Sequence, residues 1–282
     1  MAPEFTQALF LQALEEWGKY VDKVKRLAPE EQTAFLKGQG YNSLYEILAH
    51  VGVWWEEADG IIRDTIEKHE RPSRKYDFDE FNAASLARFK DTPETELLKW
   101  YEAQRQQMTA LVSSLDAEQL KMRRVYGWLD AVTLFHLKEH GIGAPRFLIL
   151  DMLQREWGAY AESFHNLTAE EQKAFLEKQG FPRFRDLVAH IVAWWEEGVQ
   201  LIEAVAKDPA YRLPDKDTDA FNAQVVESFG RLAEADLWKE YESTRTALIE
   251  LSINLPDETY EHKEVQAWLK SDVIEHYFDH AM

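Results

Sequence analysis

The sequence predicts an all-α protein made of two tandem four-helix bundles. Three observations lead to this fold class. Apolar residues recur at spacings of three and four, strand-like alternation is missing, and the chain resembles itself at an offset of 140 residues. At 282 residues, the chain has the length of about two ordinary domains. We therefore expect one bundle in residues 1–143 and a second in residues 144–282, each built from four principal helices.

The internal repeat is clearest in two short segments. Residues 49–57, AHVGVWWEE, return as residues 189–197, AHIVAWWEE, and residues 79–83, DEFNA, return as residues 219–223, DAFNA. Units of solenoid repeats are far shorter than this offset, so the pattern indicates the tandem duplication of a whole domain. Glycines and a proline in residues 141–147 mark the expected junction.

The helices are expected in the same order in both halves. The first is predicted by apolar residues at helical spacing: Leu9, Leu14, Trp17, Tyr20, Val21 and Val24. A short helix follows, with Pro29 near its start in the first half and a capping-box pattern at Thr168 and Glu171 in the second. We expect long second helices at 43–67 and 183–207, a third helical region at 81–115 broken near Pro93, and a last helix at 129–140.

Composition narrows the classes of function. The formal net charge of −19 repels phosphate backbones and anionic membranes, so nucleic acid is not an expected partner. The chain has no cysteine, which excludes disulfides, thiolate ligands and a cysteine nucleophile. It also lacks a membrane-length apolar run and the pattern of a signal peptide, so we expect no membrane association and a cytoplasmic protein.

Histidine is the residue type whose placement points to chemistry. Six of the nine histidines form three pairs at the repeat offset: His50 with His190, His136 with His276, and His140 with His280. Residues four apart on a helix share one face, so the last two histidines of each half can bind one ion together. The first lies on the long second helix, and bundles build metal sites from facing helices.

Each half therefore predicts a three-histidine site for one divalent metal. Three imidazoles leave a coordination position open for water or substrate, as catalytic sites do. The ligand type does not choose between Zn, Ni, Fe and Mn. The competing interpretation is that these histidines are core or capping residues that pack well in both halves.

The positions around the triads offer candidate supporting residues. One helical turn on either side of His50 and His190 stand an acidic residue and a tryptophan, and the matched asparagines of the DEFNA and DAFNA segments follow later. These candidates for a second shell or pocket are Glu46, Trp54, Asn82, Asp186, Trp194 and Asn222. The alternatives are a solvated helix position for the acids, plain core for the tryptophans and an assisted helix cap for the asparagines.

Other repeat-matched residues allow more than one role. Asp79 and Asp219 are predicted to cap the third helix. Two Tyr/Arg pairs line the cavity or brace the bundle: Tyr101 with Arg105, and Tyr241 with Arg245. The HLKEH segment that ends at His140 also matches the HxxEH pattern of metalloproteases, although the second copy has aspartate in place of the glutamate.

The AHxxxWWE and HxxxH segments resemble the DinB/YfiT-like metalloprotein superfamily, once in each half. DEFNA/DAFNA and WLKSDVIEHYFDH are most similar to its ClbS/DfsB branch. The resemblance implies an up-up-down-down bundle with a divalent metal on the triad. It also implies detoxifying chemistry, either thiol S-transfer with a low-molecular-weight thiol as partner or hydrolysis of a reactive small molecule. Such bundles often dimerise, so the two repeats are expected to pack as a pseudo-dimer.

Three functions therefore compete at this point. The first is a metal-dependent enzyme of detoxification, the second a non-catalytic bundle that binds or sequesters a small molecule, and the third a purely structural bundle. An S-transferase should place an arginine or lysine cluster near its pocket for the acidic thiol. The repeat-matched candidates for that role are Arg105 and Arg245.

Overall fold

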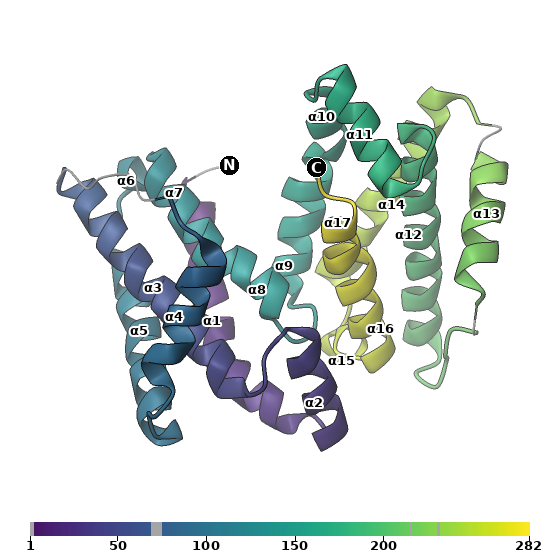
Figure 1. Cartoon of the computed structure of the whole chain (residues 1–282). Helices are drawn as coiled ribbons and strands as arrows, with labels where there is room; N and C mark the ends of the chain where they lie inside the picture. Colours follow the sequence, from purple (N-terminus) through teal and green to yellow (C-terminus); the bar gives the residue numbers. More distant parts are fainter. Residues whose placement is uncertain (1–2, 69–74, 215, 230–231) are drawn as a thin grey trace. The chain divides into compact units, whose positions relative to one another are not determined.

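The computed structural model describes residues 3–68, 75–214, 216–229 and 232–282. All regular elements in these ranges are helices, which confirms the predicted all-α class (Figure 1). The chain divides into two compact units, Met1–Ile142 and Gly143–Met282. Within the described ranges, none of the helices combines the length and the apolar character needed to cross a bilayer.

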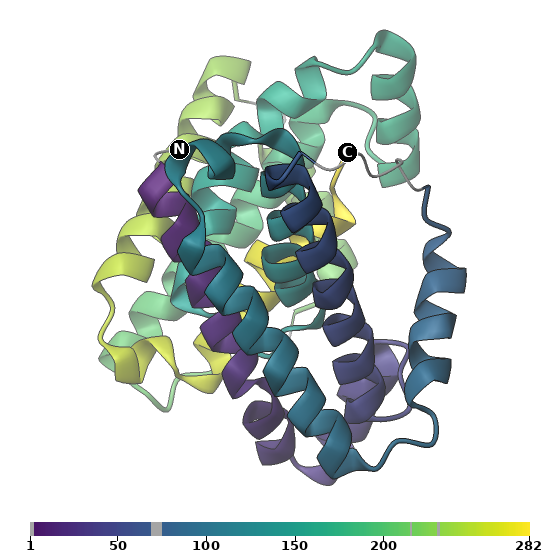
Figure 2. The same ribbon diagram turned by 90° about the vertical axis from the view of Figure 1, so that its left-hand side faces the viewer.

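The first unit is a bundle of four helical columns, of which the long ones lie side by side in Figures 1 and 2. They are α1 (Pro3–Arg26), α3 (Leu44–Ile66), α5 (Glu94–Ser114) and a last column of α7 (Arg123–Leu129), η1 (Asp130–Phe135) and α8 (His136–His140). The helix α5 packs against both α1 and α3, and η1 also packs against α1 and α3. The last column therefore lies against α3, and this brings His136 and His140 of α8 to the side of His50 on α3.

Shorter helices complete the first unit: α2 (Pro29–Gly38), α4 (Phe78–Phe89) and α6 (Ala117–Lys121). The helix α4 packs on α3. Its N-cap is Asp77, whose carboxylate accepts a hydrogen bond of 3.1 Å from the backbone N–H of Glu80. The predicted cap at Asp79 is therefore wrong by two residues, because the helix begins earlier than the DEFNA segment suggests.

The second unit has the same order of elements. Its columns are α9 (Arg146–Asp151) with η2 (Met152–Glu156) and α10 (Trp157–His165), then α12 (Phe184–Lys207), α14 (Glu234–Asn254), and finally α16 (Lys263–Trp268) with η3 (Leu269–Glu275) and α17 (His276–Asp279). The shorter helices are α11 (Ala169–Gln179), α13 (Thr218–Phe229) and α15 (Asp257–Tyr260). Thr168 forms the predicted capping box with Glu171. Asp217, not the predicted Asp219, accepts from Ala220 N–H at 3.0 Å at the start of α13.

The last column of each unit contains π-helical turns, which the sequence periodicity does not predict. A π turn replaces i→i+4 hydrogen bonds by i→i+5 bonds and is frequent at functional sites. In the first unit, the indole of Trp17 donates to the carbonyl of Thr133 at 3.2 Å, and that of Trp55 donates to the carbonyl of Val132 at 2.8 Å. The second unit repeats the arrangement with Trp157 on Val273 and Trp195 on Asp272. These indoles hold the column just before its histidine pair.

The Tyr/Arg pairs brace the bundle. The hydroxyl of Tyr101 donates to the carbonyl of Trp17 at 3.1 Å, and Arg105 donates to the carbonyl of Leu14 at 3.1 Å. The second unit repeats these bonds with Tyr241 on Trp157 and Arg245 on Leu153. Since both pairs bond to backbone of the first column, the bracing interpretation holds for them.

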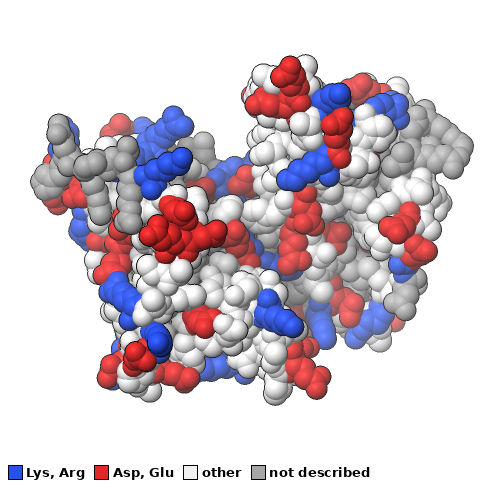
Figure 3. All heavy atoms as spheres, in the orientation of Figure 1, with Lys and Arg blue, Asp and Glu red and all other residues white. Residues whose placement is uncertain are grey.

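The surface agrees with the composition. In the view of Figure 3, acidic and basic side chains are interspersed over the face that is shown. The net charge of −19 therefore coexists with local groups of Lys and Arg.

Candidate metal centre

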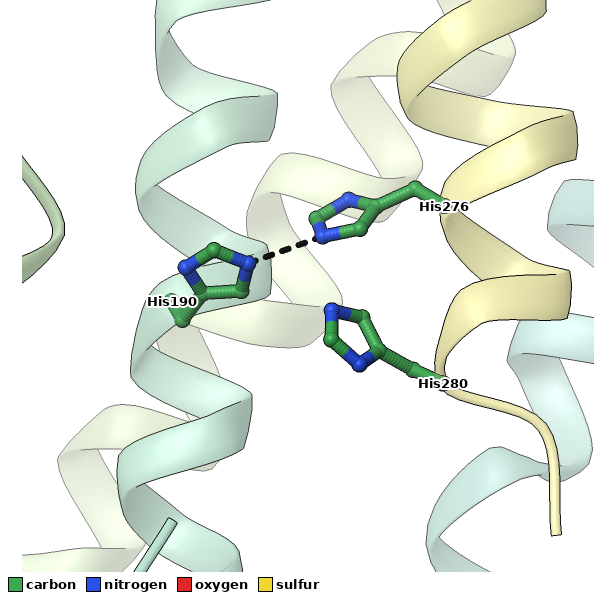
Figure 4. A group of neighbouring side chains, drawn as sticks. All are labelled: His190, His276 and His280. Carbon is green, nitrogen blue, oxygen red and sulfur yellow. Dashed lines mark hydrogen bonds between the residues drawn. The ribbon is translucent and has the colours of Figure 1, made fainter. Parts of the chain in front are cut away.

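The structure brings the three histidines of the second unit together. His190 comes from α12, His276 begins α17, and His280 follows directly after α17. One ligand nitrogen from each lies within 4.8 Å of the others. The Nε2 atoms of His190 and His276 are 2.9 Å apart, and Figure 4 shows all three rings pointing toward one another. This is the kind of cluster that can hold a metal ion.

The rings of the three histidines of the first unit also lie near one another, but their ligand nitrogens do not all come within the 4.8 Å that separates those of the second triad. His50 lies on α3, and His136 and His140 are the first and last residues of α8. The ring centroid of His50 is 5.2 Å from that of His136 and 5.3 Å from that of His140, and the last two are 5.8 Å apart. In the second unit the distance between the corresponding last two rings is 4.6 Å. The first triad is therefore the more open of the two.

A glutamine orients the last histidine of each triad. Nδ1 of His280 lies 2.6 Å from Oε1 of Gln179, whose Nε2 donates to the carbonyl of Asp279 at 2.9 Å. That second bond fixes the amide so that Oε1 is the atom that accepts from the imidazole. His140 has the same 2.6 Å contact with Gln39. Nδ1 therefore carries the proton in both rings, and the lone pair lies on Nε2.

Nδ1 is also the protonated nitrogen of His190 and His136. Oδ1 of Asn222 accepts from the indole of Trp194 at 3.0 Å and lies 3.1 Å from Nδ1 of His190. In the first unit, Nδ1 of His136 lies 2.6 Å from the carbonyl of Ala131. A carbonyl oxygen can only accept, so Nδ1 is the donor in both cases and Nε2 keeps its lone pair. Such outer hydrogen bonds are typical of metal-binding histidines.

The short contact in the second triad makes a cation favourable there. Two ligands about 2.0–2.1 Å from an ion stand about 2.9–3.4 Å apart at angles of about 90–109°, and the Nε2 atoms of His190 and His276 lie at the short end of that range. Because Nδ1 of His190 donates to Asn222, Nε2 of His190 accepts, and a proton on Nε2 of His276 can be shared with it. A metal ion would displace that proton. The residues present thus fit a divalent metal.

Burial keeps these imidazoles neutral, which is the form that binds metals. It lowers the pKa of His50 to about 3, with a further lowering by His136. It lowers the pKa of His190 and of His280 to about 4, and that of His276 to about 2. The pKa of His136 is also lowered by burial. Protons therefore compete weakly for these sites near neutral pH.

Glu46 and Asp186, the two acids predicted to support the triads, form hydrogen bonds and ion pairs with residues other than the histidines. Glu46 accepts from the backbone N–H of Asn42 at 2.7 Å, at the start of α3. Asp186 is buried and forms a bidentate ion pair with Arg183, at 2.9 and 2.7 Å. The outer partners of the histidines are instead the side-chain amides of Gln39, Gln179 and Asn222 and, for His136, a backbone carbonyl. The sequence signal that could have found Gln39 and Gln179 is their match at the repeat offset.

The tryptophan and asparagine candidates lie at the sites. The indole of Trp54 donates to Oδ1 of Asn82 at 3.0 Å, as Trp194 does to Asn222. In the first unit, a cavity of about 980 Å³ adjoins the triad. It is lined by His50, His136 and His140 together with Tyr41, Trp54, Tyr76, Phe78, Asn82, Arg123, Arg124, Gly127, Trp128, Ala131, Val132, Phe135 and Glu139. Arg123 and Arg124 were not predicted from the sequence, because Lys263 and Glu264 stand at the matched positions of the second half.

Comparison with known proteins gives one match. The family model of the DinB superfamily matches residues 4–141, which is nearly the whole of the first unit. No curated protein and no solved structure shows a significant match.

Proposed function

We propose that this chain, which belongs to the metal-associated DinB superfamily through residues 4–141, is a divalent-metal-dependent enzyme acting on a small electrophile. The reaction would take place at the triad of the first unit, where the cavity gives a ligand access to the histidines. The second triad would hold a metal ion of its own.

The observation that carries this proposal is the orientation of the histidines. Nδ1 of His136 and of His140 is engaged by Ala131 and Gln39, so Nε2 of each keeps its lone pair for an ion. An ion held by three imidazoles supplies an open position at which a carbonyl-type electrophile, a thiol or a water can be polarised. The ClbS/DfsB-like resemblance supports a thiol or water as the second reactant.

The protein would contribute binding and a hydrogen-bond donor. Tyr41 lines the cavity, and its ring lies 5.7 Å from that of His50. Burial, with Glu139 and Glu46, raises the pKa of Tyr41 to about 12, so its hydroxyl stays protonated and can donate to an oxygen of the bound molecule. The matched residue of the second half is Phe181, which has no such donor. This difference favours the first unit as the place of the reaction.

A non-catalytic binding protein is the second candidate. The observation in its favour is that Arg105 and Arg245, the candidates for binding an acidic thiol, hold backbone carbonyls of the first column instead. The cavity would then store an apolar molecule without turnover.

Turnover distinguishes the two. The metal-loaded protein is assayed with 1-chloro-2,4-dinitrobenzene plus glutathione or bacillithiol, and separately with 4-nitrophenyl acetate and water. If the protein is an enzyme, we expect it to catalyse at least one of these reactions. This activity should disappear in His136→Ala and persist in His276→Ala. Saturable binding of these compounds with no metal-dependent turnover in either assay would overturn it in favour of the binding protein.

A further inference from the structure

The cavity of the first unit runs along one face of its last column. Apart from Arg123 at its start, the column lines the cavity at positions spaced by three and four residues, from Arg124 through Trp128, Val132 and His136 to His140. Arg124 lies in α7 and His136 begins α8, and η1 (Asp130–Phe135) stands between these two helices, so Arg124 and His136 are about three helical turns apart along the column. The cavity is therefore elongated, with two arginines toward one end and the histidines toward the other.

Aromatic rings form much of the remaining wall. The ring of Trp54 lies 5.5 Å from that of Tyr76, 5.9 Å from that of Phe78 and 6.2 Å from that of Trp128. Phe78 is 64% exposed and Phe135 is 42% exposed, and both belong to the lining. Exposed apolar side chains gathered at one cavity mark a binding site for an apolar molecule.

Arg123 and Arg124 stand out in a chain of net charge −19. Both are exposed and both line the cavity. Among the described residues, neither has an ion pair with a carboxylate. Guanidinium groups bind carboxylate, sulfonate and phosphate groups through paired hydrogen bonds. This end of the cavity therefore suits an anionic group.

The second half carries different residues at the matched positions. Lys216, Thr218, Glu264 and Glu275 stand where the first half has Tyr76, Phe78, Arg124 and Phe135. Lys216 forms an ion pair of 2.6 Å with Glu197. Trp194, Trp268 and Lys263 match Trp54, Trp128 and Arg123, so the halves differ in the remaining aromatic residues of the wall and in the second arginine. The second half therefore provides a matched control within the same chain.

We propose that the cavity of the first unit binds an elongated aromatic or apolar molecule with an anionic group at one end. The apolar part packs on Trp54, Tyr76 and Trp128, the anionic group binds Arg123 and Arg124, and the other end reaches the triad. This names the substrate class of the proposed function and rests on it for catalysis, but binding itself requires neither the metal nor turnover.

Two fluorescent probes with the same ring systems test the proposal on the full-length, metal-free protein. They are 8-anilinonaphthalene-1-sulfonate, which is anionic, and N-phenyl-1-naphthylamine, which is neutral. We expect each chain to bind one molecule of the anionic probe. In Arg123→Gln/Arg124→Gln its affinity should fall about tenfold or more, which corresponds to about 1.4 kcal/mol, while that of the neutral probe changes less than about twofold.

Two further variants test whether both probes occupy this cavity and no other part of the chain. Lys263→Gln/Glu264→Gln changes the matched positions of the second half and should leave both affinities unchanged. Gly127→Trp fills the cavity, because a side chain added there meets no atom within 4 Å, and should abolish binding of both probes while circular dichroism stays native. Equal losses for both probes in the arginine variant, no loss for either, or unchanged binding in a folded Gly127→Trp variant would overturn the proposal. Failure of the enzyme proposal would appear separately, as absent turnover with probe binding intact.

Discussion

Gln179 holds His280 through a contact of 2.6 Å between Oε1 of the amide and Nδ1 of the imidazole. Because the other end of the amide donates to the carbonyl of Asp279, the glutamine fixes both the ring and its tautomer. Gln39 makes the same 2.6 Å contact with Nδ1 of His140.

Removal of these amides should weaken metal binding at one site at a time. We expect Gln179→Ala to lower the metal affinity of the second site about 10- to 100-fold, as loss of an outer hydrogen bond does elsewhere. Gln39→Ala should do the same to the first site. Titration with zinc against a chromophoric chelator resolves the two sites. If each variant left both affinities at their wild-type values, the orienting role would be contradicted.

Tyr41→Phe should reduce turnover without loss of metal. The substitution removes a hydroxyl that lines the cavity. Phenylalanine already stands at the matched position of the second half, Phe181, so the fold should tolerate the change. We expect kcat to fall about 10-fold or more, the effect of losing a hydrogen bond of roughly 1.5 kcal/mol in the transition state. Metal content and kcat are measured on the same preparation. Phe181→Tyr is the matched control and should leave kcat unchanged; an unaltered kcat in Tyr41→Phe would exclude the donor role.

Gly198→Ala should displace Trp268. Trp268 is 6% exposed, and a Cβ at residue 198 would overlap its indole ring. The matched position in the first half is Ala58, and there the matched Trp128 lines the cavity. We expect the variant to lose about 1–3 kcal/mol of unfolding free energy from overpacking, with a red-shifted tryptophan emission. Gly127→Ala, which adds a Cβ in open space, is the control. Wild-type stability and emission in Gly198→Ala would show that Trp268 does not depend on this glycine.

The metal-free protein should lose stability in mild acid. Burial lowers the pKa of His280 to about 4, whereas the unfolded chain protonates histidine near its ordinary value of about 6.5. The unfolded state therefore binds more protons in this window, and the unfolding free energy falls as the pH drops from about 6.5 to about 4, by about 3 kcal/mol for this group. Urea midpoints after dialysis against a chelator measure the effect. His280→Asn should make the dependence less steep, since the other buried histidines still contribute, and an equally steep decline in that variant would refute the assignment.

The sequence allowed a good prediction of the helices and of which histidines to consider. His136 and His140 could be found because helical spacing and the internal match coincide at these positions. The π turns could not be predicted, since they change backbone hydrogen bonds without changing the apolar spacing. Gln39 was missed because it follows the end of a short helix, where no periodic pattern gives a side chain its direction. Arg124 was missed because its counterpart is Glu264, so a search for matched residues passes over it.

The metal content of the protein purified without added metal decides whether the two histidine triads are metal sites. Elemental analysis should find about two divalent ions per chain, falling to about one in His136→Ala and about one in His276→Ala, because three imidazoles form each site. His165→Ala, outside both triads, should retain both ions. A wild-type protein with no bound ion that also fails to take up Zn, Ni, Fe or Mn on reconstitution would show that the triads do not bind a metal.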